Sequence, residues 1–135
     1  MNYLIKNTSI INEGKTMVGD VFIKDGLIER IGNNLSPQGN YTEINGEALH
    51  LMPGVIDDQV HFREPGLTHK ANIYSESRAA VAGGTTSYME MPNTNPPAFT
   101  RALLEEKYEI ASRSSIANSS FYLGTSNDNL EEIEC

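Results

Sequence analysis

The first part of the chain alternates apolar and polar positions in short runs, and this alternation predicts β-strands separated by turns. The dipeptide Asp25-Gly26 favours a tight hairpin, because both central positions of a type I′ turn must tolerate positive φ. Further turn residues between 33 and 46 interrupt any longer element. We therefore expect residues 1–52 to form a small β module. Its strands are expected at residues 3–6, 9–12, 20–24 and 27–31.

Further along, the pattern changes to strands that alternate with helices. Gly83-Gly84 is a typical C-terminal stop for a helix, and Thr100 is a typical N-cap for the next one. The acidic tail at 128–134 is expected to begin another helix. Alternating strands and helices indicate βα units and a parallel sheet, so residues 53–135 are expected to form an α/β region. Its strands are expected at 55–63, 85–91 and 119–123, and its helices at 72–82 and 100–112.

Composition places the chain among globular proteins, since 39% of its 135 residues are hydrophobic and 21% are charged. The net charge of −8 argues against a nucleic-acid partner, because affinity for nucleic acid depends mainly on cations that contact phosphate. No stretch has the pattern of a membrane span or a signal peptide. The single cysteine, Cys135, cannot form an internal disulfide. These features predict a cytoplasmic protein that contacts neither nucleic acid nor membrane.

Four polar side chains share one side of the expected strand at 55–63, because successive side chains of a strand point to opposite faces. They are Asp57, Gln59, His61 and Arg63. At the C-terminal end of a parallel strand, a neutral imidazole can bind a metal ion and an arginine can grip a carboxylate through two hydrogen bonds. The spacing alone also allows a hydrogen-bonded strand histidine and a solvated arginine, so both interpretations stay open.

Three sequence motifs resemble the dihydroorotases of the amidohydrolase superfamily. They are PGVIDDQVHFREPGLTHK at residues 53–70, RAAVAGGTT at 78–86 and MEMPNT at 89–94. The resemblance implies that the chain contains the first strands of a (β/α)8 barrel, preceded by a small N-terminal β module that is part of a composite β-sandwich. A complete barrel needs about 250 residues, whereas residues 53–135 have room for about three strands and two helices. The barrel is therefore expected to be incomplete in this chain.

The resemblance implies a zinc site at the end of the first barrel strand, where the family usually carries His-x-His-x-Arg and binds one or two zinc ions. His61 corresponds to the second histidine, and Gln59 stands in the place of the first. An amide oxygen binds zinc more weakly than an imidazole nitrogen does. Gln59 is therefore either a weak ligand or a polar residue that forms hydrogen bonds inside a site with one metal ion or none.

The resemblance also implies two substrate-binding residues, Arg63 after the first barrel strand and Asn93 after the second. A planar guanidinium suits a carboxylate, and a side-chain amide can donate a further hydrogen bond. On sequence alone, a turn residue beside Pro92 is the favoured interpretation of Asn93. The implied reaction is the reversible conversion of dihydroorotate and water to N-carbamoyl-L-aspartate in de novo pyrimidine synthesis. The general-base aspartate would come from a later strand, so no catalytic residue is expected in this chain.

Two hypotheses follow. In the first, the chain is part of a metal-dependent hydrolase that takes a small-molecule substrate and forms a homo-oligomer at full length, while the 135 residues alone are inactive. The combination of Arg63 with the Pro-Asn-Thr motif favours dihydroorotase over hydantoinase or allantoinase, whose substrates lack the same carboxylate. In the second, the glutamine at position 59 marks a non-catalytic relative that acts as a partner-binding module.

Overall fold

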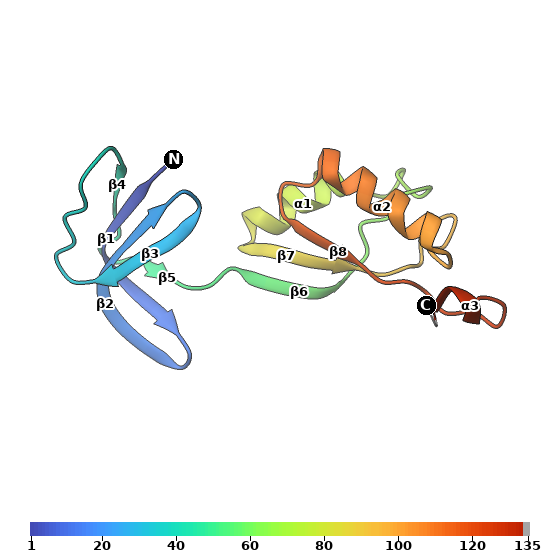
Figure 1. Ribbon diagram of the computed structural model, residues 1–135, viewed down its shortest axis with the longest axis horizontal. Helices are drawn as coiled ribbons and strands as arrows, with labels where there is room; N and C mark the ends of the chain where they lie inside the picture. Colours follow the sequence, from blue (N-terminus) through green and yellow to red (C-terminus); the bar gives the residue numbers. More distant parts are fainter. Residues whose placement is uncertain (134–135) are drawn as a thin grey trace. The chain divides into compact units, whose positions relative to one another are not determined.

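The computed structural model of the protein describes residues 1–133. The chain divides into two compact units, the first ending at Pro53 and the second beginning at Gly54 (Figure 1). The fold is mixed α/β, since the first unit is a β-sheet and the second combines a parallel sheet with helices. Within the described residues, none of the helices has the length and apolar character needed to cross a bilayer.

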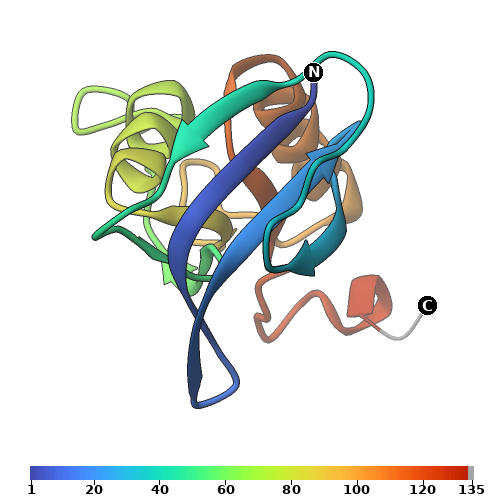
Figure 2. The ribbon, with the colours of Figure 1, turned by 90° about the vertical axis from the view of Figure 1, so that its left-hand side faces the viewer.

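The first unit is a five-stranded sheet. Its strands are β1 (Tyr3–Asn12), β2 (Lys15–Lys24), β3 (Leu27–Gly32), β4 (Thr42–Asn45) and β5 (His50–Leu51). The order is β3-β2-β1-β4, and β5 also pairs with β1 (Figure 2). Neighbours β1, β2 and β3 are antiparallel, whereas β4 and β5 run parallel to β1. The φ angles of Asp25 (51°) and Gly26 (82°) confirm the tight hairpin predicted between β2 and β3.

Strand β1 corrects the prediction, because it is one continuous strand rather than two. Its pairing with β2 is irregular between Ile5 and Thr8, where Asn7 has a φ of 56°. The buried Asp20 carboxylate stabilises this irregularity by accepting a hydrogen bond from the backbone N–H of Asn7, at 2.9 Å. The sequence pattern also does not predict β4 or β5. These short segments lie among turn residues and form by parallel pairing with β1.

The second unit contains a three-stranded sheet in the order β6-β7-β8, and both pairings are parallel, as predicted. Its strands are β6 (Val55–Val60), β7 (Thr85–Glu90) and β8 (Asn118–Phe121), and its helices are α1 (Ile73–Ala82), α2 (Arg101–Ser114) and α3 (Leu130–Ile133). Helices α1 and α2 lie on one face of this sheet (Figure 1). Strand β6 is shorter than predicted and ends at Val60, so His61 and Arg63 lie in the segment that follows it. Residue 134 of the predicted tail helix and Cys135 lie outside the described residues.

Side-chain caps explain where the two longer helices begin. The Asn72 side chain accepts a hydrogen bond from the Ser75 backbone N–H at 2.8 Å and caps α1. Thr100 caps α2 as predicted, since its hydroxyl accepts from the Leu103 backbone N–H at 3.3 Å. Each cap satisfies a backbone donor that the helix itself leaves unpaired, and loss of such a cap costs about 1 kcal/mol. The two caps therefore fix the residues at which α1 and α2 begin.

Aromatic side chains form much of the core between the parallel sheet and its helices. The rings of Phe62 and Tyr88 lie 4.4 Å apart between centroids, and Phe121 meets Tyr108 edge-on at 4.8 Å. Ile73 at the start of α1 is fully buried beside them. Such ring pairs add about 0.5–1.5 kcal/mol beyond their burial. Because Phe62 directly follows β6 and Phe121 ends β8, this core fixes the segments at the C-terminal end of the sheet.

Candidate functional site

The C-terminal ends of β6 and β7 bring together two residues singled out by the sequence. His61 follows β6, Asn93 lies in the loop after β7, and His61 Nδ1 is 2.9 Å from Asn93 Oδ1. Because a carbonyl oxygen only accepts hydrogen bonds, the imidazole donates in this contact. Both side chains are exposed. The asparagine therefore orients the imidazole ring, whose second nitrogen, Nε2, is not part of this hydrogen bond.

Arg63 occupies an unusual backbone conformation two residues further on. Its φ is 71°, which is uncommon for a residue other than glycine. The Arg63 backbone N–H donates to Glu90 Oε1 at 3.0 Å, and its carbonyl accepts from the Leu67 N–H at 3.0 Å. Within residues 1–133, its guanidinium makes no ion pair, and it makes no hydrogen bond with His61 or Asn93. The structure thus leaves the arginine side chain available, although it does not join it to the other two.

A buried ion pair, which the sequence analysis did not identify, lies directly behind this site. Glu90 is 1% exposed and Lys107 is 0% exposed, and Glu90 Oε2 lies 2.9 Å from Lys107 Nζ. The ammonium also donates to the Met91 carbonyl oxygen at 3.0 Å. Burial raises the pKa of the Glu90 carboxyl, while Lys107 and the backbone N–H groups of Arg63 and Phe62 act in the opposite direction. The sequence signal was a lysine four residues before Ala111 on the buried face of α2.

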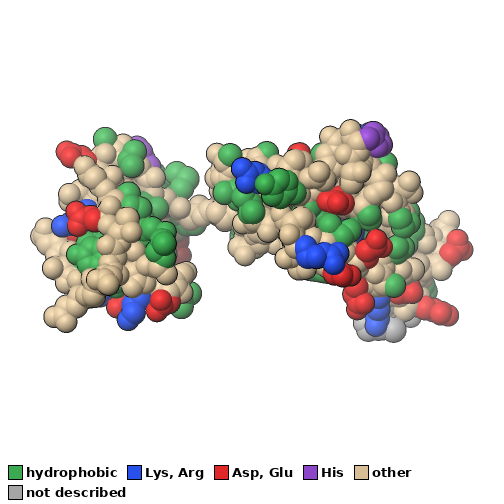
Figure 3. All heavy atoms as spheres, turned by 90° about the horizontal axis from the view of Figure 1, so that it is seen from above, with side chains coloured by type: hydrophobic (Ala, Val, Ile, Leu, Met, Phe, Trp, Pro, Cys, Tyr) green, Lys and Arg blue, Asp and Glu red, His purple; other side chains and the backbone are tan. Residues whose placement is uncertain are grey.

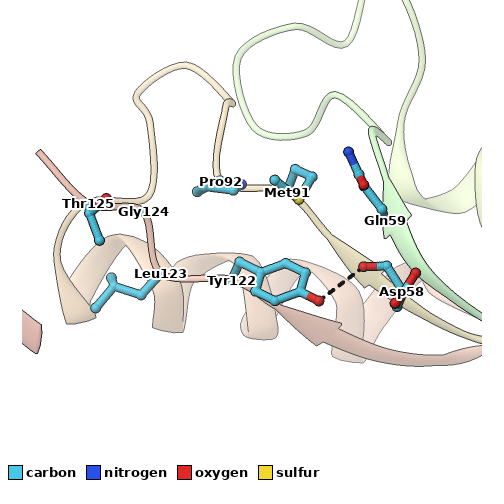
Figure 4. Close-up of a pocket in the computed structure, with 8 residues that line it drawn as sticks. All are labelled: Asp58, Gln59, Met91, Pro92, Tyr122, Leu123, Gly124 and Thr125. Atoms are coloured by element: carbon cyan, nitrogen blue, oxygen red, sulfur yellow. Dashed lines mark hydrogen bonds between the residues drawn. The ribbon is translucent and has the colours of Figure 1, made fainter.

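Gln59 lies at the rim of an open pocket of about 410 Å³ at this end of the sheet (Figure 4). The Tyr122 hydroxyl donates to the Asp58 carbonyl oxygen at 3.0 Å, which ties the segment after β8 to β6. In Figure 4 the Gln59 side chain leaves β6 beside Met91, and it is exposed. The pocket is lined by Asp58, Gln59, Met91, Pro92, Tyr122, Leu123, Gly124 and Thr125.

A protein-family model described as "Dihydro-orotase-like" matches residues 49–125, which is more than half of the chain. The chain belongs to the dihydroorotase-like family. This match includes β6, β7 and β8 together with the loops that carry His61, Arg63 and Asn93. The family assignment therefore covers the region where the sequence motifs and the structural site coincide.

Similar proteins place the chain within this family more closely. A dihydroorotase from Carboxydothermus hydrogenoformans is 46% identical over 102 residues, which cover 72% of this chain and 23% of that protein. An allantoinase from Solibacter usitatus is 37% identical over 131 residues, covering 96% of this chain and 28% of that protein. The structure of an L-hydantoinase from Arthrobacter aurescens superposes with a TM-score of 0.91 at 29% identity, over 97% of this chain and 29% of that one. The chain thus spans about a quarter of the length of its curated relatives.

Dihydroorotase-like proteins are typically zinc-dependent, which makes the donor atoms of this chain relevant. Among residues 1–133, no three His, Cys, Asp or Glu side chains cluster closely enough to hold a metal ion. His61 offers one imidazole nitrogen, and Gln59, two residues earlier in the sequence, offers an amide oxygen. Zinc sites normally use three or four protein ligands, mostly imidazoles, thiolates and carboxylates. The described residues therefore do not form a complete zinc site, and we derive no catalytic step through a metal ion from them.

Proposed function

We propose that this chain forms the N-terminal part of a (β/α)8 amidohydrolase that converts dihydroorotate and water reversibly to N-carbamoyl-L-aspartate. Membership of the dihydroorotase-like family supports a hydrolase of cyclic amides. The three parallel strands with helices on one face agree with the beginning of such a barrel. The observation that carries the proposal is the convergence of His61 and Asn93, at 2.9 Å, in a segment where Arg63 follows His61 by two residues.

In this proposal Arg63 and Asn93 bind the substrate carboxylate. The guanidinium supplies a bidentate, charge-assisted pair of hydrogen bonds. Asn93 uses its Oδ1 to accept from His61, so its Nδ2 hydrogens remain to donate to the carboxylate. His61 Nε2 is the ligand that this chain would contribute to a metal site, and Gln59 is a weaker second donor. The general-base aspartate and the other ligands belong to a part of the protein beyond these strands.

The same proposal includes a cytoplasmic location, a small-molecule substrate and a homo-oligomeric full-length protein. A second function, a non-catalytic relative that binds a partner protein, is favoured by one observation. Gln59 stands where the family motif carries an imidazole. The two functions differ in whether the native protein holds stoichiometric zinc and turns over substrate.

The decisive experiment uses the native protein that contains this chain. Its intact mass and zinc content are measured, and dihydroorotate, hydantoin and allantoin are supplied in parallel as substrates. We expect turnover of dihydroorotate alone, because Arg63 and Asn93 suit its carboxylate. Replacement Arg63→Met is expected to raise KM for dihydroorotate by at least about tenfold, the loss of one charge-assisted contact.

The exposed Arg113, which pairs with Glu109 on the surface of α2, provides the matched control. The Arg113→Met variant removes the same charge and is expected to keep the wild-type KM. Turnover of allantoin or hydantoin in preference to dihydroorotate would refute the substrate assignment. A protein without zinc or turnover that copurifies with a catalytic subunit would support the partner-binding function instead.

A further inference from the structure

Glu90 and Lys107 form a buried connection between helix α2 and both loops of the proposed site. Lys107 approaches Glu90 Oε2 at 2.9 Å and also donates to the Met91 carbonyl oxygen at 3.0 Å. The other oxygen of Glu90 accepts the Arg63 backbone N–H at 3.0 Å. One ammonium group is thus linked through Glu90 to the segment after β6, and directly to the start of the loop after β7.

The unusual backbone conformation of Arg63 requires a stabilising contact such as its hydrogen bond to Glu90. Its positive φ places a bulky side chain in the left-handed region, which persists only where surrounding contacts hold it. Glu90 provides a fixed acceptor because it is buried and its second oxygen lies 2.9 Å from the Lys107 ammonium. The carboxylate therefore holds the backbone that determines the direction in which the arginine side chain leaves the loop.

Asn93 is linked to the same pair through the backbone. Met91 lies two residues before Asn93, its N–H donates to the Val60 carbonyl oxygen at 3.0 Å, and its own carbonyl accepts from Lys107. The loop that carries Asn93 therefore begins at a residue whose backbone N–H and carbonyl oxygen are both hydrogen-bonded. Displacement of Lys107 would be expected to loosen the loops of Arg63 and Asn93 together.

We propose that Glu90, held by Lys107, is a positioning residue that sets the backbone of Arg63 and thereby aims its guanidinium at the carboxylate of the substrate. This inference rests on the proposed function, in which Arg63 binds that carboxylate. A purely structural ion pair would instead stabilise the unit without any specific effect on Arg63. Well-packed apolar residues can often replace a buried ion pair without loss of stability, which offers a way to separate these roles.

The first test measures amide hydrogen exchange and the φ-dependent three-bond coupling of Arg63 by NMR in the full chain. The double variant Glu90→Leu/Lys107→Met removes both charges and keeps similar volumes. We expect α1 and α2 to remain protected while protection of the Arg63 amide falls by at least about tenfold, because its acceptor is gone. The Glu90→Gln variant keeps a carbonyl oxygen for this amide and is expected to retain more of the protection.

Glu64→Gln is the matched control, because Glu64 accepts a backbone hydrogen bond from Ile73 at 2.9 Å rather than from Arg63. This variant is expected to leave the Arg63 amide unchanged. If the Arg63 amide and coupling stay as in the wild type in the double variant, the inference is overturned. If the double variant does not fold, the single variant Glu90→Leu decides, because it also removes the acceptor of the Arg63 amide. An unchanged Arg63 coupling together with an unchanged substrate KM in Glu90→Leu would overturn the inference.

The second test measures kinetics of the native enzyme. A positioning role predicts that the double variant raises KM for dihydroorotate by at least about tenfold, with a smaller change in kcat. An unchanged KM contradicts the inference even where the exchange result agrees. Wild-type protein without turnover would refute the proposed function, and the exchange measurement would then decide alone whether Glu90 sets the Arg63 backbone.

Discussion

Each of the two units buries one carboxylate near an irregular stretch of backbone, but the two carboxylates are held differently. Asp20 in the first unit is 2% exposed and accepts backbone N–H groups from Asn7, at 2.9 Å, and Leu35, at 2.8 Å. Glu90 in the second unit accepts a backbone hydrogen bond from Arg63 and pairs with the buried Lys107. Asp20 thus relies on fixed backbone dipoles, whereas Glu90 depends on a side chain from another element.

The pKa values of the two carboxyls shift in opposite directions. The hydrogen bond from Asn7 lowers the pKa of Asp20, assisted by Leu35 and Lys6 and opposed by burial. For Glu90 burial is the largest influence and raises the pKa, despite the opposing effect of Lys107. Backbone donors therefore stabilise a charge that organises a strand in the first unit. In the second unit, burial makes the charged form of Glu90 less favourable, and this residue lies beside the loops of the proposed site.

Both sheets also leave large apolar side chains on the surface, and green hydrophobic groups are visible on both units in Figure 3. In the first unit, Leu27 and Ile28 of β3 are 74% and 65% exposed, beside an apolar groove of about 200 Å³. In the second, Ile56 of β6 is 69% exposed. Contiguous apolar surface of this kind is typical of a face that other protein covers. This exposure agrees with the finding that the chain spans about a quarter of the length of its curated relatives.

The largest effect is expected from the Lys107→Met replacement. It leaves the Glu90 carboxylate buried without its cation, and removal of one partner of a buried pair costs about 3–5 kcal/mol. We expect the free energy of unfolding of the second unit, measured by denaturant titration, to fall by this order. Arg113→Met breaks the exposed pair with Glu109, and the cost there is expected to be about 0.3–0.5 kcal/mol. Equal losses in the two variants would contradict the importance of the buried pair.

A smaller effect is expected from alanine at a glycine, and its size should differ between the units. Gly66 has a φ of 80°, and a Cβ there would clash with the Asn95 carbonyl oxygen. Gly26 has a similar φ of 82°, but a Cβ there would meet nothing within 4 Å. We expect Gly26→Ala to lower the free energy of unfolding by about 1–2 kcal/mol, because the left-handed backbone is the only unfavourable feature for alanine there. Gly66→Ala adds about 1–3 kcal/mol for displacing the Asn95 loop.

Thermal unfolding of the two alanine variants measures this difference. The chemical shifts of His61 and Asn93 provide a second readout for Gly66→Ala, because the displaced loop carries Asn93. These shifts should change in Gly66→Ala and stay constant in Gly26→Ala. A Gly66→Ala variant as stable as Gly26→Ala would show that the loop yields without cost.

The sequence predicted those parts of the fold whose cause is local. The Asp25-Gly26 hairpin, the Thr100 cap and the three parallel strands follow from turn chemistry, capping and periodicity, and the structure confirms them. Strands β4 and β5 were not predicted because their formation depends on pairing with β1, which is distant in sequence. The continuity of β1 was missed for a similar reason. Asn7 looks like a turn residue, and it is Asp20, distant in sequence, that keeps it within the strand.

The residues of the proposed site were likewise only partly predictable from the sequence. Motif resemblance selected His61, Arg63 and Asn93, and the structure joins the first and third directly. Helical spacing signals only Lys107, four residues before Ala111, and it does not predict the Glu90–Lys107 pair. A glutamate inside a strand and a lysine on a helix normally face solvent, and only the crossing of α2 over the end of β7 buries both. By helical spacing, one face of α2 contains Leu103, Leu104, Tyr108 and Ala111. Lys107 is nevertheless more buried than Tyr108, which is 42% exposed.

The smallest expected effect is the pH dependence of the two carboxylates, which should have opposite signs. The folded pKa of Asp20 lies below its ordinary value of 3.8, so its stabilising contribution is complete above 3.8 and is lost as the pH falls through the folded value. The folded pKa of Glu90 lies above 4.5, so its contribution is present below 4.5 and is lost as the pH rises through the folded value.

Opening free energies from amide exchange at Leu35 and Arg63, corrected for intrinsic rates, report the two groups separately. Acidification should weaken protection at Leu35 and strengthen it at Arg63, and Asp20→Asn and Glu90→Gln should each abolish only one trend. Parallel trends at both amides would show that Lys107 outweighs burial at Glu90, so that the two units hold their carboxylates in the same way after all.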